Sequence, residues 1–184
     1  MKEKRAAIEL SIGTIVIIVL AMSMLILGLV LVSNIFDGST DNIDALNDGV
    51  KGKIQDLLDV GDKKVAVYLS NQIAPIEQGE EWGVAFGIKN LNRGATGAET
   101  FTYQVKVADP DVRQKCQIGE RDVESWIRAG KAGSAAIAPG DSYYGIVRVL
   151  IPESAPLCIV RFNLEVKLDG ATYATDFFDI DVLA

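Results

Sequence analysis

Residues 157–183 read LCIVRFNLEVKLDGATYATDFFDIDVL, and this stretch carries the strongest fold signal in the chain. Two runs of β-branched and aromatic residues flank Asp169-Gly170, and apolar and polar residues alternate along both runs. A period of two places successive side chains on opposite faces of a strand. Asp-Gly suits the two-residue turn of a hairpin, because both residues of that turn need a positive φ. The stretch predicts a β-hairpin with one buried face.

Strand-like segments also precede this hairpin, and turn-forming pairs such as Gln78-Gly79, Arg93-Gly94 and Asp109-Pro110 separate them. The segments are VAVYLS (65–70), EEWGVAFGIKN (80–90), TFTYQVKVAD (100–109), VRQKCQI (112–118) and DSYYGIVRVLIP (141–152). About seven strands without long helices between them predict an immunoglobulin-like antiparallel β-sandwich over residues 62–184. Residues 119–133 lack the strand-like pattern of the other segments, so we expect them to form a short helix or an excursion that carries Trp126.

A connector over residues 37–61 precedes the predicted sandwich. Its apolar residues recur at intervals of three and four, which is typical of an amphipathic helix, and they are Ile43, Leu46, Val50, Ile54, Leu57 and Leu58. Thr40 or Asp41 suits the helix N-cap, and Gly61 suits its end. We expect the apolar stripe of this helix to pack either on the predicted sandwich domain that follows it or on a neighbouring subunit.

The N-terminal segment is strongly apolar, because residues 10–36 contain no charged side chain. About 20 helical residues suffice to cross a hydrocarbon core of about 30 Å, whereas the apolar region of a secretory signal has about 7–15 residues. We therefore expect one long hydrophobic helix over residues 7–36. Basic residues precede it and acidic residues follow it, which predicts a cytoplasmic N-terminus and an extracellular domain at 62–184. The expected fold class is thus α+β.

The sequence KRAAIELSIGT (residues 4–14), followed by unbroken hydrophobic residues, resembles the class III signal peptide of the type IV pilin superfamily, in its archaeal pilin and archaellin branch. The resemblance covers about the first 35 residues and implies a leader over residues 1–6. Lys4 and Arg5 would be its basic pair, and a prepilin peptidase would cut after Ala6. Ala7 would then be the new N-terminus, although a cut after Ala7 also fits the pattern.

The same resemblance implies that copies of the chain pack their apolar segments in the centre of a filament. Ser11, Gly13, Thr14 and Gly28 would allow close helix approach, or they reflect ordinary transmembrane composition. Glu9 either lies at headgroup level or neutralises the new amine of a neighbouring subunit. The sequence departs from the family pattern in two ways: the family's glutamate is the fifth mature residue and Glu9 would be the third, and alanine precedes the cut.

The two cysteines, Cys116 and Cys158, form either a disulfide or a pair of buried free thiols. An even cysteine count in an exported domain favours the disulfide. In the chain-entropy model, closing a loop of this length stabilises the folded state by about 4 kcal/mol.

Composition argues against several function classes. The chain has no histidine, the commonest general base and zinc ligand, and its net charge of −7 does not suit nucleic-acid binding. Two acidic clusters fit a solvated turn and the wet face of a strand better than a cation site; they are Glu77, Glu80 and Glu81, and Asp176, Asp179 and Asp181. We expect no catalytic site, no metal and no cofactor.

The leading hypothesis is therefore a structural subunit of an archaeal type IV pilus-like or archaellum-like filament. The expected partners are copies of the chain, the prepilin peptidase, the filament assembly machinery and the membrane, together with an unidentified cell-surface ligand. The alternative is a single-pass, membrane-tethered adhesion or binding module that does not polymerise.

Overall fold

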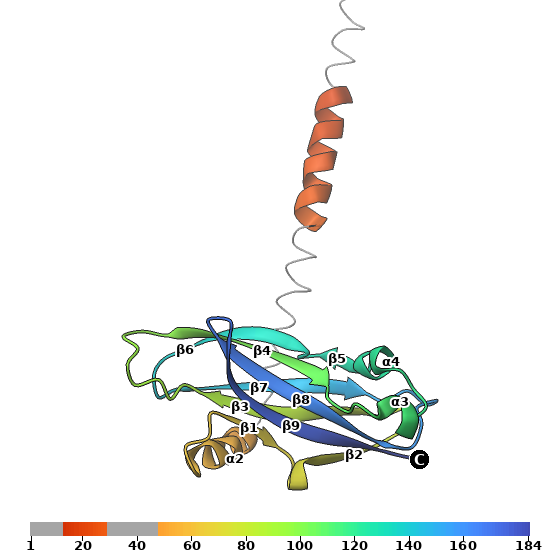
Figure 1. Ribbon diagram of the computed structural model, residues 1–184. Coiled ribbons are helices and arrows are strands. Elements are labelled where there is room, and N and C mark those ends of the chain that lie inside the picture. The colour runs from red at the N-terminus through yellow and green to blue at the C-terminus, as the bar shows by residue number, and fades with distance from the viewer. Residues whose placement is uncertain (1–12, 29–47) are drawn as a thin grey trace, which may run out of the picture. The chain divides into compact units, whose positions relative to one another are not determined.

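The computed structural model describes residues 13–28 and 48–184, which are drawn in colour in Figure 1. The chain divides into two compact units, Met1–Asp41 and Asn42–Ala184, and each is described by itself. In the first unit, residues 13–28 form a helix whose residues are all exposed. Within the described ranges, no helix combines the length and the apolar composition that crossing a membrane requires.

The fold class expected from the sequence is wrong. The described residues are mostly β, with two sheets and short helices, and they contain no long apolar helix. The remainder of the expected helix over 7–36, and the leader over 1–6, lie outside the described residues.

The second unit contains nine strands among its described residues. They are β1 (Val65–Tyr68), β2 (Ile73–Glu77), β3 (Glu81–Lys89), β4 (Glu99–Val107), β5 (Ile127–Ala129), β6 (Ala132–Ile137), β7 (Ser142–Leu150), β8 (Ile159–Leu168) and β9 (Ala171–Leu183). Its short helices are α2 (Asp48–Asp59), the 3₁₀ turn η1 (Ser70–Gln72), α3 (Val112–Lys115) and α4 (Glu120–Glu124).

The strands form two sheets packed face to face, so the predicted β-sandwich is confirmed (Figure 1). One sheet has the order β1-β3-β7-β5 and the other has the order β2-β9-β8-β4-β6. The expectation of a wholly antiparallel sandwich is wrong, because β2 pairs with β9 in parallel. The chain leaves β1 through η1, where Asn71 and Gln72 have positive φ, and crosses from one sheet to the edge of the other.

The hairpin predicted around Asp169-Gly170 is confirmed. Leu168 pairs with Ala171, and Asp169 and Gly170 have φ of 51° and 81°. Strand β8 alternates buried and accessible residues along most of its length, as a strand with one face on the core should. Its Phe162 stacks on Phe178 of β9, with ring centroids 5.4 Å apart.

One segment expected as a strand is helical instead. Residues 112–118 were expected to be extended, but Val112–Lys115 form the single turn α3. The turn at Asp109-Pro110 leads into it, and the amide of Lys115 donates to the carbonyl of Asp111. The following excursion contains α4 and then Trp126, which is 1% exposed and lies within the main core.

Helix α2 confirms the second half of the predicted amphipathic helix and packs on the sandwich, whereas the expected N-cap at Thr40 or Asp41 lies outside the described residues. Ile54 and Leu58 are fully buried against Ala66 and Ala85, on the face of the four-stranded sheet that points away from the main core. Glycine at position 87 permits this contact, because a Cβ there would lie 2.4 Å from Ile54 Cγ2.

We expect Gly87→Ala to lower the free energy of unfolding by about 1–3 kcal/mol, because the added methyl group collides with α2. Denaturant titration of the full-length chain in detergent, followed by tryptophan fluorescence, measures the change. Gly97→Ala is the control, since a Cβ at that position meets nothing within 4 Å. Equal stability of the two variants would show that α2 does not need this contact.

The buried tyrosines predict alkaline sensitivity. Burial raises the pKa of Tyr103 and of Tyr143 above the ordinary value of 10.0, and their ring centroids lie 6.1 Å apart. The folded state holds these protons more tightly than the unfolded state, so stability is complete below about pH 10 and falls as pH rises above it. We expect Tyr103→Phe to reduce this loss of unfolding free energy, measured by denaturation at pH values up to about 11. The control Tyr68→Phe changes a position that is 40% exposed and should leave the loss as large as in the unchanged protein.

Candidate functional site

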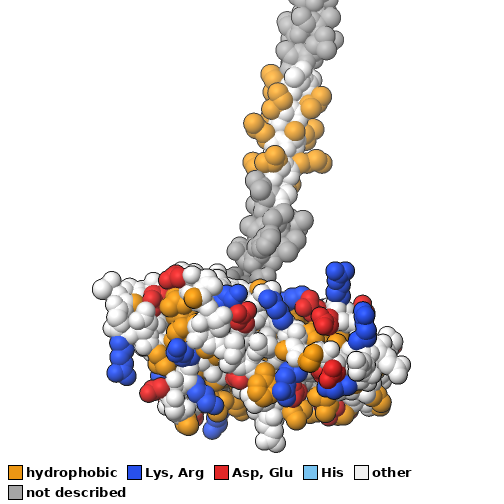
Figure 2. Space-filling view, viewed as in Figure 1, with side chains coloured by type: hydrophobic (Ala, Val, Ile, Leu, Met, Phe, Trp, Pro, Cys, Tyr) orange, Lys and Arg blue, Asp and Glu red, His pale blue; other side chains and the backbone are white. Residues whose placement is uncertain are grey.

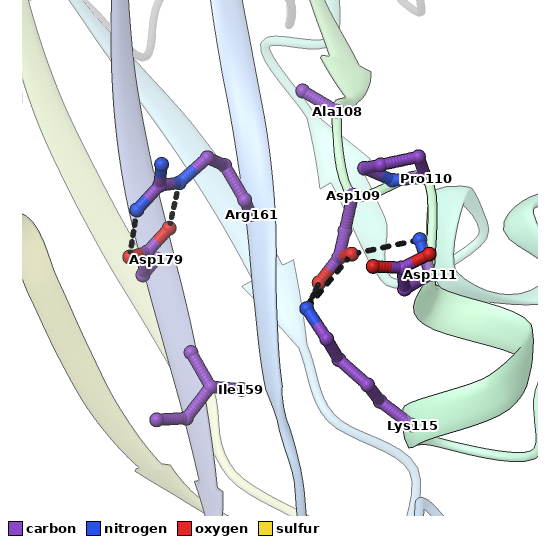
Figure 3. A pocket seen from close by; sticks show the side chains of 8 residues that line it. All are labelled: Ala108, Asp109, Pro110, Asp111, Lys115, Ile159, Arg161 and Asp179. Carbon is purple, nitrogen blue, oxygen red and sulfur yellow. Dashed lines mark hydrogen bonds and ion pairs between the residues drawn. The ribbon is translucent and has the colours of Figure 1, made fainter.

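A hollow lined by several charged side chains lies beside the first half of β8, and Figure 3 shows it from close by. It encloses about 540 Å³ and opens to the surface. Its lining comes from β8, β9, α3 and the segment between β4 and α3, and consists of Ala108, Asp109, Pro110, Asp111, Lys115, Ile159, Arg161 and Asp179. We call it the Arg161 pocket.

The ion pair between Arg161 and Asp179 forms one wall of the pocket. These residues are cross-strand partners on β8 and β9, and the guanidinium binds the carboxylate through both oxygens, at 2.7 Å and 2.8 Å. The hydrogen bond to Asp179 raises the pKa of Arg161. The guanidinium also lies over the ring of Phe177, 4.2 Å from its centroid. A planar cation held on two sides has little freedom to turn toward another anion.

A second ion pair lies across the pocket. The carboxylate of Asp109 accepts the backbone N–H of Asp111 at 3.0 Å and lies 3.3 Å from the ammonium of Lys115. Asp109 is 8% exposed although it is charged, so these two partners compensate its burial. The interactions fix the turn that starts α3, and the amide of Ala108 joins that turn to the carbonyl of Arg161.

A disulfide between Cys116 and Cys158 closes the same end of the sandwich, and the predicted bond is thereby confirmed. Their Cα atoms lie 5.6 Å apart, Cys116 directly follows α3, and Cys158 directly precedes β8. The disulfide and the hydrogen bond from the Ala108 amide to the Arg161 carbonyl together tie the excursion over residues 108–126 to the start of β8.

The arrangement is better suited to holding structure than to chemistry. Asp109 and Asp179 are each paired with a cation, so neither presents a free charge to a substrate. Within residues 13–28 and 48–184, no three side chains of the metal-ligating types come together. The sequence predicted that Asp179 lies on the solvent-exposed face of its strand, but in the structure the side chain of Arg161 covers it. This ion pair could not be predicted from the sequence, because it depends on the register of β8 against β9.

An apolar hollow lies on the outer face of the four-stranded sheet, beside α2. It encloses about 530 Å³, and its lining includes Val50, Tyr68, Ile73, Trp82 and Ile146. Helix α2 covers Ala66 and Ala85 of this face and leaves Trp82 43% exposed. We call this surface the Trp82 groove. The neighbouring tyrosines of β7 are used internally, since Tyr143 packs on the core and the hydroxyl of Tyr144 donates to Gln55 of α2.

The residues predicted for processing and assembly are mostly not placed. Lys4, Arg5, Ala6, Ala7, Glu9 and Ser11 lie outside the described residues. Gly13, Thr14 and Gly28 lie in the helix over residues 13–28, and a Cβ at either glycine would meet nothing within 4 Å in this chain. Their role in close helix approach therefore stays a prediction.

Comparison with known proteins gives no family. No known family matches the chain, and no curated protein matches it. Among solved structures, it is similar to the CARDB domain of a Pyrococcus furiosus protein in complex with di-metal ions, at 13% identity and a TM-score of 0.43, over 65% of this chain and 86% of that one.

Two further similarities are of the same kind. The ASH/PapD-like domain of human CEP192 has 10% identity and a TM-score of 0.35, over 66% of this chain and 84% of that one. Spo0M, a sporulation control protein from Bacillus subtilis, has 17% identity and a TM-score of 0.35, over 66% of this chain and 49% of that one. Values this low carry no argument about ligands or function.

We expect reduction of the Cys116–Cys158 bond to lower the free energy of unfolding by about 2–4 kcal/mol, because the reduced unfolded chain regains conformational entropy. Denaturant titration with and without a thiol reductant measures the loss. The variant with both cysteines changed to serine is the control. Its free energy of unfolding should equal that of the reduced protein and should not change when the reductant is added. Unchanged stability on full reduction would mean that the disulfide does not stabilise this end of the sandwich.

Proposed function

We propose that the chain is a structural subunit of a surface filament of the archaeal type IV pilus or archaellum kind. Its apolar N-terminal segment would pack among the segments of other copies, and its β-sandwich would be displayed outside. Before assembly, the segment would lie in the membrane with its N-terminus in the cytoplasm. The segment that resembles the pilin leader and start motivates this proposal.

The observation that carries the proposal is the surface of the helix over residues 13–28. Its large apolar side chains are between 50% and 76% exposed, and Figure 2 shows them on all visible sides of the helix. A helix that is apolar all round is unstable in water and needs cover from lipid or from similar helices. Copies of the same segment would provide that cover in a filament.

The sandwich has properties that suit display outside the cell. Its disulfide fits an oxidising compartment, because such bonds are rare in reducing cytosol. Figure 2 shows basic and acidic side chains interspersed over the visible face, without a field of one sign. In the Arg161 pocket, Asp109 and Asp179 are each paired with a cation, which supports a structural role for these two carboxylates.

The second candidate function is a membrane-tethered adhesion module that stays monomeric. The Trp82 groove favours it, because an exposed tryptophan and tyrosine beside an apolar hollow are typical of recognition surfaces. In this alternative the apolar segment would remain in the bilayer and the groove would bind the ligand.

The mature N-terminus distinguishes the two functions. If the chain is a filament subunit, intact-mass measurement of the protein from its native membranes should show a chain that begins at Ala7 or Ile8. Electron microscopy of the fraction sheared from the cell surface should show filaments that contain it. The variant Ala6→Glu serves as the control, because a charged residue before the cut should retain the leader and abolish the filaments.

An intact Met1 on the protein from membranes, together with a sheared fraction that lacks the chain, would contradict the filament proposal and support the tethered module.

A further inference from the structure

Strand β6 forms one edge of the five-stranded sheet, and its sequence AGSAAI contains no charge and no proline. Ala132, Ser134 and Ala136 are exposed, whereas Ile137 is buried. On the inner face, the ring of Tyr103 covers Gly133, where a Cβ would lie 2.7 Å from the ring. The inner face of β6 therefore packs on Tyr103, while the edge of β6 that faces away from β4 has no neighbouring strand among the described residues.

The direction of the free backbone groups follows from the register. The amide of Val105 donates to the carbonyl of Lys131 at 2.7 Å, and β6 continues from there in antiparallel register with β4. Since successive residues of a strand point their N–H and C=O groups to opposite sides, Gly133 and Ala135 face β4. Ala132, Ser134 and Ala136 consequently direct their N–H and C=O groups away from the sheet.

The other three edges among the described strands carry protection that β6 lacks. In β2, Pro75 removes a donor. In β1, the outward N–H of Val67 is already bound by the carboxylate of Asp176 at 2.9 Å. Strand β5 has three residues, includes Arg128, and has an irregular register against β7. Short edges, charges, bulges and prolines are devices that prevent edge-to-edge association.

We propose that β6 pairs with β6 of a second copy of this chain, in antiparallel orientation around Ser134, so that one sheet continues through both copies. Ser134 then lies opposite Ser134 of the other copy, and Ala132 lies opposite Ala136. These are small side chains, so the two edges approach without steric conflict. The outward N–H and C=O groups of each strand satisfy those of the other.

Charge argues for a second copy as the occupant. The chain has a net charge of −7, so two copies repel over much of their surface, but β6 itself is uncharged. Lys131 precedes the strand and is paired with Glu124 of the same chain at 3.0 Å. In antiparallel pairing around Ser134, Lys131 lies opposite Ile137 of the other copy, whereas in-register parallel pairing places the two Lys131 side chains opposite each other.

This pairing is independent of the proposed filament function, since a tethered module with the same sandwich presents the same edge. It concerns the sandwich unit alone and uses no residue of the N-terminal segment.

Cysteine cross-linking of the full-length chain in the membranes of producing cells tests the proposal. Hydrogen-bonded partners in an antiparallel pair have Cα atoms about 5.5 Å apart, which a disulfide spans. Under mild oxidation, Ser134→Cys should give about tenfold more covalent dimer on a non-reducing gel than Thr102→Cys, because paired cysteines have a high effective concentration. Thr102 is the matched control: it is exposed on the same face and pairs with Ser134, one strand in from the edge.

The register has its own test, which also serves if Ser134→Cys fails to fold. A tagged chain with Ala132→Cys, produced together with a chain carrying Ala136→Cys, should form a mixed dimer, whereas Ala132→Cys alone should not. Ser134→Lys in both chains should abolish the mixed dimer by placing two ammonium groups opposite each other, and Thr102→Lys should leave it unchanged.

Two outcomes overturn the proposal. One is equal dimer from Ser134→Cys and Thr102→Cys, which would mean random collision. The other is cross-linking of Ala132→Cys with itself but not with Ala136→Cys, which would mean that β6 is not paired antiparallel around Ser134.

Discussion

The pairing of β8 with β9 is the interaction on which the rest of the sandwich depends. The two strands pair from Ile159–Asp181 to Leu168–Ala171, and each then supports another part of the fold. Strand β8 pairs with β4 on its other side, and β9 pairs with β2. A side chain of β9, Asp176, also binds the edge of β1 in the opposite sheet. Loss of this pairing would therefore split the five-stranded sheet between β9 and β8.

The two ends of this pair are fixed by different physics. At one end the Asp169-Gly170 turn sets the register through backbone conformation alone. At the other end, register brings Arg161 beside Asp179, and the Cys116–Cys158 bond ties the neighbouring excursion to the start of β8. Polar groups buried at this end are paired, which is what an interior of low dielectric requires. The charged side chains of the Arg161 pocket therefore serve to pair the polar groups at this end of the sandwich.

The surfaces that remain open are those that suit association. Helix α2 covers only part of the outer face of the four-stranded sheet, so Trp82 stays exposed, and β6 leaves hydrogen-bonding groups at an edge. Both features lie on the sandwich, and both are separate from the apolar helix over residues 13–28. The contacts between copies that we propose would therefore involve the sandwich as well as the N-terminal segment.

The amino-acid pattern by itself determined the local features. Alternation around Asp169-Gly170 predicted the hairpin, spacing predicted the buried Ile54 and Leu58 of α2, and the even cysteine count favoured the disulfide. These predictions are correct because hydrophobic periodicity and turn chemistry depend on residues that are close together in the sequence. Composition predicted a long helix over residues 7–36, of which the structure describes only the helical residues 13–28.

Tertiary structure alone decided the rest. The parallel pairing of β2 with β9, the pairing of Arg161 with Asp179, and the position of β6 at an edge depend on contacts between residues far apart in the chain. The single turn of α3 is local, yet its β-like composition is overridden by the turn at Asp109 and by the disulfide. Such features follow from which strands become neighbours, and that choice is made by the packing of the whole core.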